Sequence, residues 1–445
     1  MQTQGWSKIP LLPFRQAVSS GRPDLKGDSI MGEHAMTPQQ ARMAPFYWPR
    51  WIVLIMVVGM VAVLAPIIII SGSATATAPA KGNYVPQTRT YFIGADEVDW
   101  NYAPTGSDQI TGEPFDETAA VFTQQGPQRI GSTYIKSLYR EYTNSSFRTL
   151  KPRTAADRHL GMLGPVIRAV VGDTIKVVFK NNLDRPVSVH THGVFYDKGS
   201  EGAPYNDGTS PADHRDDAVA PGTVYTYSYK VPDRAGPGPM DGSSVMWMYH
   251  SHTDEVGDDY AGLVGPMVIT KASAARTDGT PEDVDREFFV QFKVSDENAS
   301  PYLQRNITRF AGDPASVDPG NEEFGESNLM HSVNGYVFGN LPLDAMTMKK
   351  GERVRWYLMG MGTEVDLHTP HWHGNTVTAL GMRTDVVSLL PATMVTADMV
   401  PDDPGTWLFH CHVNDHISAG MLVRYRITNA SAPRNGNSVH SGHTS

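Results

Sequence analysis

The sequence contains one pattern twice, and this internal duplication limits the folds that the chain can adopt. A Val-Pro-Asp turn precedes residues 247–252 (Trp-Met-Tyr-His-Ser-His) in the first half and residues 407–412 (Trp-Leu-Phe-His-Cys-His) in the second. Upstream, Gly-Asp leads to residues 190–193 (His-Thr-His-Gly), and Gly-Glu leads to residues 371–374 (His-Trp-His-Gly). The repeated order indicates two homologous domains, each with two His-x-His elements.

Short apolar runs separated by turn residues predict that both domains consist of β-strands. From Thr90 onward, runs such as residues 174–179 alternate apolar and polar side chains, with Gly, Pro, Asn and Asp between them. This pattern is typical of a β-sandwich, and no long helical period is present. We expect one domain over residues 89–275 and a second over residues 284–430.

The one long apolar run, residues 51–70, carries no charge and is long enough to cross a bilayer. Lys and Arg residues precede it, so the positive-inside rule places the chain after it outside the cytoplasm. A signal peptide cut near Ala76 is the alternative. We expect the following segments: cytoplasmic and disordered, 1–50; transmembrane helix or signal anchor, 51–71; linker, 72–88; disordered tail, 431–445.

Charge and cysteine content narrow the classes of function. The net charge is −10 and no long basic run occurs, which argues against nucleic-acid binding and favours small partners. Cys411 is the only cysteine, so no intrachain disulfide can form. We therefore interpret Cys411 through its neighbours.

The four His-x-His elements predict a metal centre. On a β-strand, residues i and i+2 share a face, so each element aims two imidazoles at one point. One such pair is commonly polar surface or hydrogen-bonded core, but four pairs in a duplicated domain suit a redox metal such as copper. The eight residues are His190, His192, His250, His252, His371, His373, His410 and His412.

The last element has a cysteine at its centre. The Cys411 side chain projects opposite to its flanking histidines, so one strand serves a thiolate site on one face and a histidine site on the other. Two candidate ligands, His416 and Met421, follow Cys411, and a third, His368, lies three residues before His371. Together they complete a set of two histidines, a thiolate and a weak thioether. This set describes a blue, type 1 copper site. The alternative is that Cys411 and Met421 are ordinary core residues.

The first domain lacks this blue site. Ser251 stands where Cys411 stands in the second copy, and Val187 stands where His368 does. We therefore expect one blue copper per chain.

Residues 368–374 and 410–421 resemble the multicopper oxidases, and residues 97–104, 140–143 and 332–336 are similar to the ceruloplasmin branch of that family. The likeness covers roughly residues 90–428. It implies an all-β fold of two cupredoxin-like Greek-key β-sandwich domains, here preceded by one N-terminal transmembrane helix. It also implies that His190 and His371 hold a type 2 copper. By the same resemblance, the type 3 copper pair is held by His192, His250, His252, His373, His410 and His412.

The resemblance also implies an assembly. In six-domain ceruloplasmin the trinuclear copper cluster forms where the first domain meets the last. Two domains cannot close that ring, whereas three copies of this chain can. We predict a membrane-attached homotrimer in which each cluster lies between the first domain of one chain and the second domain of its neighbour.

The resemblance implies an oxidase that takes electrons from a small donor at the type 1 site and reduces O2 to water. Asp415 and Glu297 match positions similar to the iron-binding carboxylates of the branch, so we expect Fe(II) as the donor and ferroxidase activity. Asp207 is a candidate proton donor beside the cluster, or a plain turn aspartate. A calcium site of this branch, or an acidic loop, is expected at Asp213, Asp216 and Asp217.

Rival functions remain open at this point. A laccase that oxidises phenols would share every copper ligand and differ only in the pocket over His416. A cuprous oxidase would use methionines, for which Met240, Met246, Met248, Met359 and Met361 are candidates. A copper nitrite reductase would need a type 1 site in its first domain, which Ser251 excludes. A non-enzymatic module of this fold would have eroded ligands, whereas every expected ligand is present.

Overall fold

The computed structural model describes residues 84–429. The expected cytoplasmic segment, the membrane helix, nearly all of the linker and the tail lie outside these residues. Among the described residues, no helix is both long enough and apolar enough to span a bilayer.

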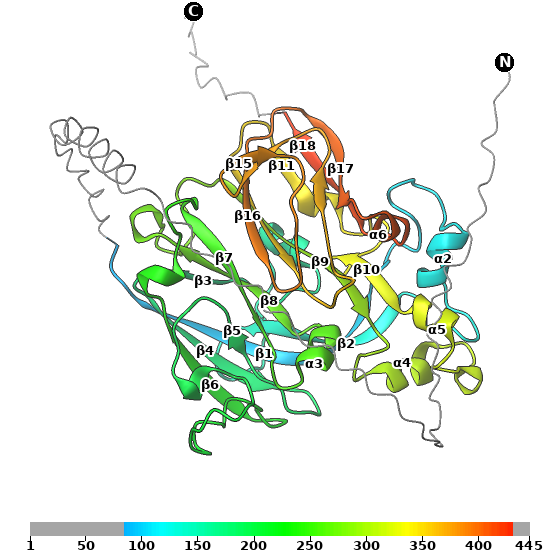
Figure 1. The fold of residues 1–445 in the computed structure, drawn as a ribbon, viewed down its shortest axis with the longest axis horizontal. Helices are drawn as coiled ribbons and strands as arrows, with labels where there is room; N and C mark the ends of the chain where they lie inside the picture. The colour runs from blue at the N-terminus through cyan, green and yellow to red at the C-terminus, as the bar shows by residue number, and fades with distance from the viewer. Residues whose placement is uncertain (1–83, 430–445) are drawn as a thin grey trace, which may run out of the picture. The chain divides into compact units, whose positions relative to one another are not determined.

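Strands between residues 88 and 270 form two four-stranded sheets with the orders β2-β1-β4-β6 and β3-β8-β7-β5 (Figure 1). Burial in β4 alternates: Ile175, Val177 and Phe179 are fully buried, whereas Lys176 is exposed, which is the predicted period of two. The strands are β1 (Thr88–Asn101), β2 (Thr133–Tyr142), β3 (Ile167–Val170), β4 (Thr174–Asn181), β5 (His190–Thr191), β6 (Val224–Lys230), β7 (Ser244–His250) and β8 (Val264–Thr270). We call these two sheets the first sandwich.

Strands between residues 286 and 428 form a six-stranded sheet, β10-β9-β12-β16-β14-β15, and a four-stranded sheet, β11-β18-β17-β13. We call them the second sandwich. Its strands are β9 (Arg286–Asp296), β10 (Leu329–Val333), β11 (Thr347–Lys349), β12 (Val354–Gly360), β13 (Pro370–Trp372), β14 (Val377–Ala379), β15 (Met382–Thr384), β16 (Met394–Met399), β17 (Gly405–Cys411) and β18 (Leu422–Thr428).

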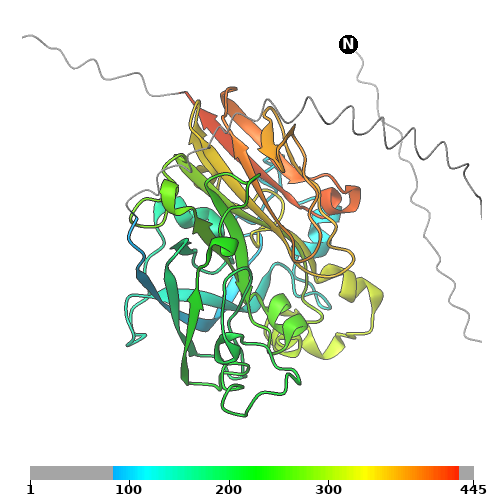
Figure 2. The ribbon, with the colours of Figure 1, turned by 60° about the vertical axis from the view of Figure 1, so that its left-hand side comes forward.

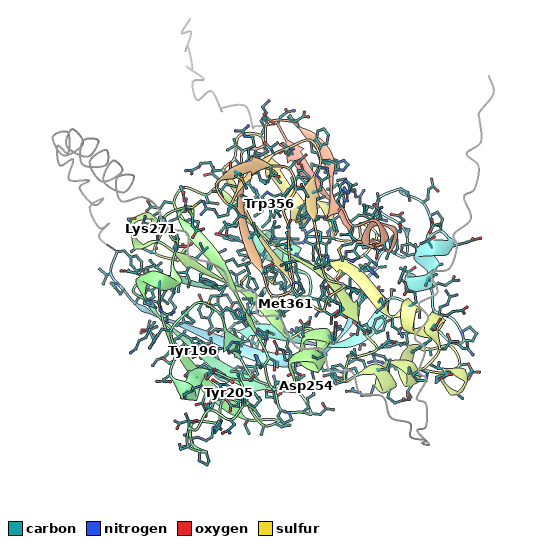
Figure 3. The ribbon with its side chains drawn as sticks, viewed as in Figure 1. Tyr196, Tyr205, Asp254, Lys271, Trp356 and Met361 are labelled. Atoms are coloured by element: carbon teal, nitrogen blue, oxygen red, sulfur yellow. The ribbon has the colours of Figure 1, made fainter. Side chains whose placement is uncertain are left out.

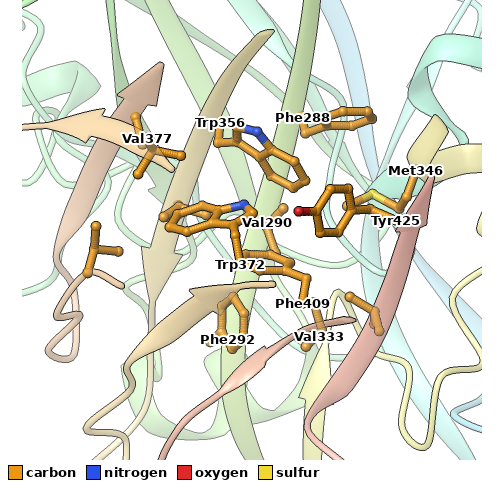
Figure 4. Close-up of a cluster of buried hydrophobic side chains, with 14 of the residues drawn as sticks. Phe288, Val290, Phe292, Val333, Met346, Trp356, Trp372, Val377, Phe409 and Tyr425 are labelled. Atoms are coloured by element: carbon orange, nitrogen blue, oxygen red, sulfur yellow. The ribbon is translucent and has the colours of Figure 1, made fainter. Parts of the chain in front are cut away.

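Aromatic side chains fill the core of the second sandwich (Figure 4). The Trp372 and Phe409 rings stack with centroids 4.8 Å apart, and the Trp356 ring lies 5.7 Å from that of Trp372. Cys411 and Met421 belong to the same buried cluster. The core therefore fixes the strand end that carries the cysteine.

The duplication in the sequence reappears as a duplicated strand register. His190 on β5 pairs with His250 on β7, and His371 on β13 pairs with His410 on β17. In both sandwiches two His-x-His elements from different strands therefore come to lie side by side at one edge.

The fold is mostly β, with a few short helices that the all-β expectation did not include. They are α2 (Glu117–Thr123), α3 (Glu255–Ala261), α4 (Leu303–Phe310), α5 (Glu322–Ser327) and α6 (Asn414–Ser418). Helix α3 follows β7 and α6 follows β17, so each lies just beyond a His-x-His element.

The two sandwiches are in contact through β7 and β16, which lie beside each other in both views (Figures 1 and 2). Arg355 on β12 donates to the hydroxyls of Ser243 and Ser244 at 2.8 and 2.7 Å. A buried apolar cluster that includes Met248 and Met359 fills the space between them.

Candidate metal centre

Three of the four expected type 1 ligands converge in the second sandwich. The Cys411 Sγ atom lies 3.5 Å from His416 Nδ1 and 3.9 Å from His368 Nδ1, and the two Nδ1 atoms are 3.2 Å apart. All three side chains are buried. The fourth, Met421, is fully buried in the same core, and its backbone carbonyl accepts a hydrogen bond from Cys411 N at 3.2 Å. A soft metal ion that takes sulfur and imidazole ligands fits this arrangement.

Asp366 fixes the orientation of one of these ligands. It is fully buried, its Oδ1 atom lies 3.1 Å from His368 Nε2, and it accepts hydrogen bonds from Val294 N (2.7 Å) and Thr363 N (2.9 Å). Because Nε2 is held in this way, His368 presents Nδ1 to the centre. Sequence reasoning missed Asp366, although it lies only two residues before His368.

The surroundings of Cys411 favour the thiolate that a metal needs. Burial raises the pKa of this thiol, but contacts with His368 and His416 and a hydrogen bond from Thr369 N (3.4 Å) outweigh burial and lower the pKa to about 6. A thiol with such a pKa is largely ionised near neutral pH.

The first sandwich brings four histidines together. Ligand atoms of His190, His192 and His250 lie within 4.8 Å of one another, and the ring centroid of His252 is 5.2 Å from that of His190. The ring centroids of His190 and Tyr196 lie 5.9 Å apart. We call this set the first half-site.

The second sandwich repeats this arrangement. Ligand atoms of His371, His373 and His410 lie within 4.8 Å of one another, and the ring of His412 is 5.5 Å from that of His371. We call this set the second half-site.

Facing imidazole nitrogens indicate that both half-sites suit metal ions. His192 Nε2 is 3.2 Å from His250 Nε2, and His373 Nε2 is 3.1 Å from His410 Nε2. Nδ1 of His250 lies 3.0 Å from a backbone carbonyl, so this ring can donate there and leave Nε2 free for a metal. Burial lowers the pKa of His250 to about 3 and of His192 to about 4, which keeps both rings in the neutral, ligating form.

The described part of the chain does not join its two half-sites. Each histidine group that can hold a metal draws its members from one sandwich only. His373 and His412 of the second half-site are exposed. One chain therefore offers two separate sets of four histidines, of which the second has two exposed members.

The expected iron-binding carboxylates lie in different surroundings. Asp415 is exposed on α6, directly before His416. Glu297 is fully buried, forms an ion pair with Lys136 and accepts a hydrogen bond from Tyr102 Oη at 2.6 Å. Glu297 is therefore paired with a buried cation and is not accessible to solvent.

The candidate proton donor and the acidic loop lie beyond the first half-site. Asp207 is held by Lys198 Nζ (3.1 Å) and by Thr209 N (2.8 Å), and no contact joins it to a histidine of the half-site. Asp216 is fully buried; its Oδ2 accepts from Gly202 N at 2.7 Å, and its Oδ1 has no partner. Burial raises the pKa of Asp216 to about 6. Its neighbour Asp217 contacts His214 Nδ1 at 2.6 Å.

Sequence reasoning also missed His331. Its ring, on β10, lies 5.3 Å from that of His416, and its Nδ1 atom lies 3.0 Å from Leu329 O. Burial lowers the pKa of His331 to about 4, so the ring is neutral near neutral pH. Its only signal in the sequence is that it directly precedes residues 332–336, one of the segments that resemble the ceruloplasmin branch.

Comparisons with known proteins agree with this geometry. Two family models described as "Multicopper oxidase" match residues 141–274 and 313–431. Ferroxidase HEPHL1 of Homo sapiens is 47% identical over 78% of this chain and 30% of that protein, and Hephaestin of Homo sapiens is 45% identical over 77% and 30%. Ceruloplasmin of Homo sapiens is 40% identical over 79% of this chain and 33% of its own length. The chain thus spans about a third of the length of these curated relatives.

Proposed function

Because this chain belongs to the multicopper oxidase family, in the branch of ceruloplasmin and hephaestin, we propose that it oxidises a one-electron donor and reduces O2 to water. The position of Cys411 carries the proposal. It closes the type 1 set on one face of β17, while its neighbours His410 and His412 belong to the second half-site. One strand therefore links electron entry to the oxygen site by covalent bonds.

Copper would supply the one-electron redox chemistry, and the residues of the chain would hold it as one type 1, one type 2 and two type 3 ions per functional unit. The type 1 ion would be held by His368, Cys411, His416 and Met421. His190 and His371 would hold the type 2 ion, and the other six half-site histidines the type 3 pair. We infer that both domains lie outside the cytoplasm behind a membrane helix at residues 51–71.

The separation of the two half-sites supports a homotrimer in which each oxygen site forms between two chains. Exposed apolar side chains lie close to half-site histidines: Phe195 (48%) is three residues after His192, Val256 (60%) is four residues after His252, and Val386 (37%) forms a β-bridge with His371. Exposed apolar groups gathered around a site are compatible with an interface. A second copy of the chain would cover them and complete the set of eight histidines.

Complementation tests this assembly. One variant carries His192→Ala and His250→Ala, the other His373→Ala, and each is expected to be inactive alone. Co-expressed, they should regain up to about a quarter of wild-type O2 uptake, because random mixing pairs two intact halves at that frequency. Co-expression of differently tagged copies of one variant is the control and should restore nothing. A wild-type monomer that keeps full activity on dilution would contradict the trimer.

Fe(II) is the donor that the surroundings of the type 1 site support best. Asp415 supplies a carboxylate next to His416, and His331 supplies a neutral imidazole 5.3 Å, ring to ring, from the same residue. Carboxylate and imidazole ligands bind iron and stabilise the ferric product, which makes electron loss easier. Glu297 does not enter this site, because its charge is paired with Lys136 inside the protein.

Donor specificity is tested by O2 uptake with Fe(II), a phenol and Cu(I). We expect Asp415→Ala and His331→Ala to raise KM for Fe(II) about tenfold, the equivalent of roughly 1.4 kcal/mol, and to leave phenol turnover unchanged. Asn414→Ala, an exposed neighbour on the same helix, is the matched control. Phenol oxidation with iron turnover insensitive to both changes would identify a laccase instead. Cuprous oxidation has less support, because four of the five candidate methionines are buried and only Met240 is exposed.

The orphaned Oδ1 atom of Asp216 supports a calcium site in the acidic loop with Asp213 and Asp217. Calcium should raise the melting temperature, and Asp216→Asn should remove this effect without changing the blue absorption.

Asp207 stays a candidate proton donor for the oxygen site. Asp207→Asn should then slow O2 uptake with every donor, whereas Asp213→Asn should not.

A further inference from the structure

The first sandwich retains the backbone of a type 1 site although its ligands are gone. Ser188 N donates to Ser251 Oγ at 3.0 Å, just as Thr369 N donates to Cys411 Sγ at 3.4 Å. Ser251 and Cys411 are both fully buried. The two residues therefore occupy equivalent positions in three dimensions as well as in the sequence.

Backbone hydrogen bonds identify the residue that stands where His416 stands in the second sandwich. Met421 N donates to His416 O at 2.9 Å, and in the first sandwich Leu263 N donates to Asp258 O at 3.0 Å. The segment after Ser251 is two residues longer than the segment after Cys411, so counting from the His-x-His element points to Val256 instead. By hydrogen bonding, Asp258 is the counterpart of the metal ligand.

Asp258 is hydrogen-bonded to Ser251, whereas its counterpart His416 would bind the same metal ion as Cys411. The Oδ2 atom of Asp258 accepts from Ser251 Oγ at 2.6 Å and from Asp254 N at 3.3 Å. Asp254, which is labelled in Figure 3, is the N-cap residue of α3. The Oδ1 atom of Asp258 accepts from Arg185 Nε and Nη2 at 3.2 and 3.1 Å. Arg185 in turn donates to Tyr302 Oη of the second sandwich at 2.8 Å. Asp258 is buried and Arg185 is partly buried, and these charge-assisted hydrogen bonds are stronger than hydrogen bonds between neutral groups.

Ser251 lies between His250 and His252, so whatever fixes Ser251 also fixes both imidazoles. We propose that Asp258 is a positioning residue for the first half-site and that it holds the strand end through Ser251, in place of the copper that would bind Cys411 in the second sandwich. The proposal rests on the proposed function, because it assigns the half-site to the oxygen site. Metal ligands need geometry held to about half an ångström, which supporting hydrogen bonds supply.

The test uses the full chain with Asp258→Asn and Ser251→Ala, measured by copper analysis, absorption spectra and amide exchange of the metal-free protein. Asp258→Asn should weaken copper binding at the half-sites about 10- to 100-fold and leave the blue absorption per chain unchanged. Ser251→Ala should act in the same direction but less, because the Asp258–Arg185 pair survives. In the metal-free protein, exchange should quicken over residues 250–254 and stay the same over residues 410–414. Asp366→Asn is the mirrored control, with losses at the type 1 site only.

A purely structural role for Asp258 would give a different result. In that case the type 1 copper and the half-site copper would be lost together, and amide exchange would quicken throughout the chain. That result would overturn the proposal. Unchanged copper binding and unchanged exchange in both variants would overturn it as well. Failure of the proposed function is distinguishable, because wild type would then bind only the type 1 copper. The exchange measurement on metal-free protein still decides the role of Asp258 in that case.

Discussion

The two sandwiches share a backbone pattern and differ in the side chains that face the central residue of the last His-x-His element. In the second sandwich Cys411 faces His368 and His416, and in the first sandwich Ser251 faces Asp258. Both copies retain their four half-site histidines. The two copies therefore share their strand ends, but a hydrogen-bonded pair stands in the first sandwich where three candidate metal ligands stand in the second. We infer electron entry in the second sandwich only.

Other parts of the duplication did not diverge in this way. Asp173 accepts from Arg89 Nε at 2.6 Å near the start of β1, and Glu352 accepts from Arg286 Nε at 2.7 Å at the start of β9. These carboxylates follow equivalent glycines, Gly172 and Gly351, whose φ angles are 102° and 81°. Such φ angles are adopted readily only by glycine, so the sequence kept Gly at both turns.

The largest difference between the sandwiches should appear when each central residue is changed. Cys411→Ser removes the only thiolate, so we expect the blue absorption to vanish and O2 uptake to fall to background with every donor. The electron paramagnetic resonance signal of the type 2 ion should remain, because its proposed ligands are untouched. The corresponding change in the first sandwich, Ser251→Ala, should leave the blue absorption intact. Residual blue absorption in Cys411→Ser would contradict the assignment of one blue site per chain.

The sequence was sufficient to predict the family and the clustering of the histidines and Cys411, but not the residues that support these clusters. Strand periodicity and the Cys411 motif predicted which side chains share a face, because these depend on local spacing. Glu297 and His331 depend on contacts between strands distant in the chain: Glu297 pairs with Lys136, and His331 packs on His416. Asp258 was hidden by a two-residue difference in loop length, which only the hydrogen bonds reveal. The membrane helix and the homotrimer stay predictions.

A second prediction concerns the contact between the sandwiches. His159 belongs to the first half of the chain but packs against Phe288 and Phe289 of β9, and its Nε2 accepts from Phe289 N at 2.9 Å. Burial lowers the pKa of His159 from 6.5 to about 4. Above pH 6.5 folded and unfolded chains both hold it neutral; as the pH falls toward 4, only the unfolded chain takes up the proton. Stability should therefore drop by up to about 3 kcal/mol over that range.

His159→Gln separates this contribution from the other titrating groups, because glutamine can accept from Phe289 N and does not titrate. Urea unfolding of both proteins at pH 7 and pH 4 gives the comparison. The variant should lose less stability than wild type on acidification. Equal losses would show that His159 is not held neutral at this contact.

A third, smaller effect is expected at Asp366, which has the supporting role in the second sandwich that we propose for Asp258 in the first. Asp366→Asn keeps an acceptor for Val294 N but removes the charge beside His368. We expect type 1 copper affinity to fall about 10- to 100-fold and the half-sites to keep theirs. Competition with a copper chelator, followed at the blue absorption, measures this. Loss of half-site copper in this variant would contradict the expectation, because it would show that Asp366 also supports the half-sites and not the type 1 site alone.

The smallest effect, no new absorption at all, is expected for Ser251→Cys. This change restores the thiol in the first sandwich, but Val187 stands where His368 would be and Leu263 stands where Met421 would be, both buried and without a ligand atom. The thiol would also face the Asp258 carboxylate, which disfavours a second negative charge at this buried position. The blue absorption per chain should therefore equal that of wild type at saturating copper. A second blue band would show that the first sandwich still has the geometry of a type 1 site. The replacement of Cys by Ser251 would then be enough to explain why only the second sandwich has a blue site, without a contribution from the Ser251–Asp258 hydrogen bond.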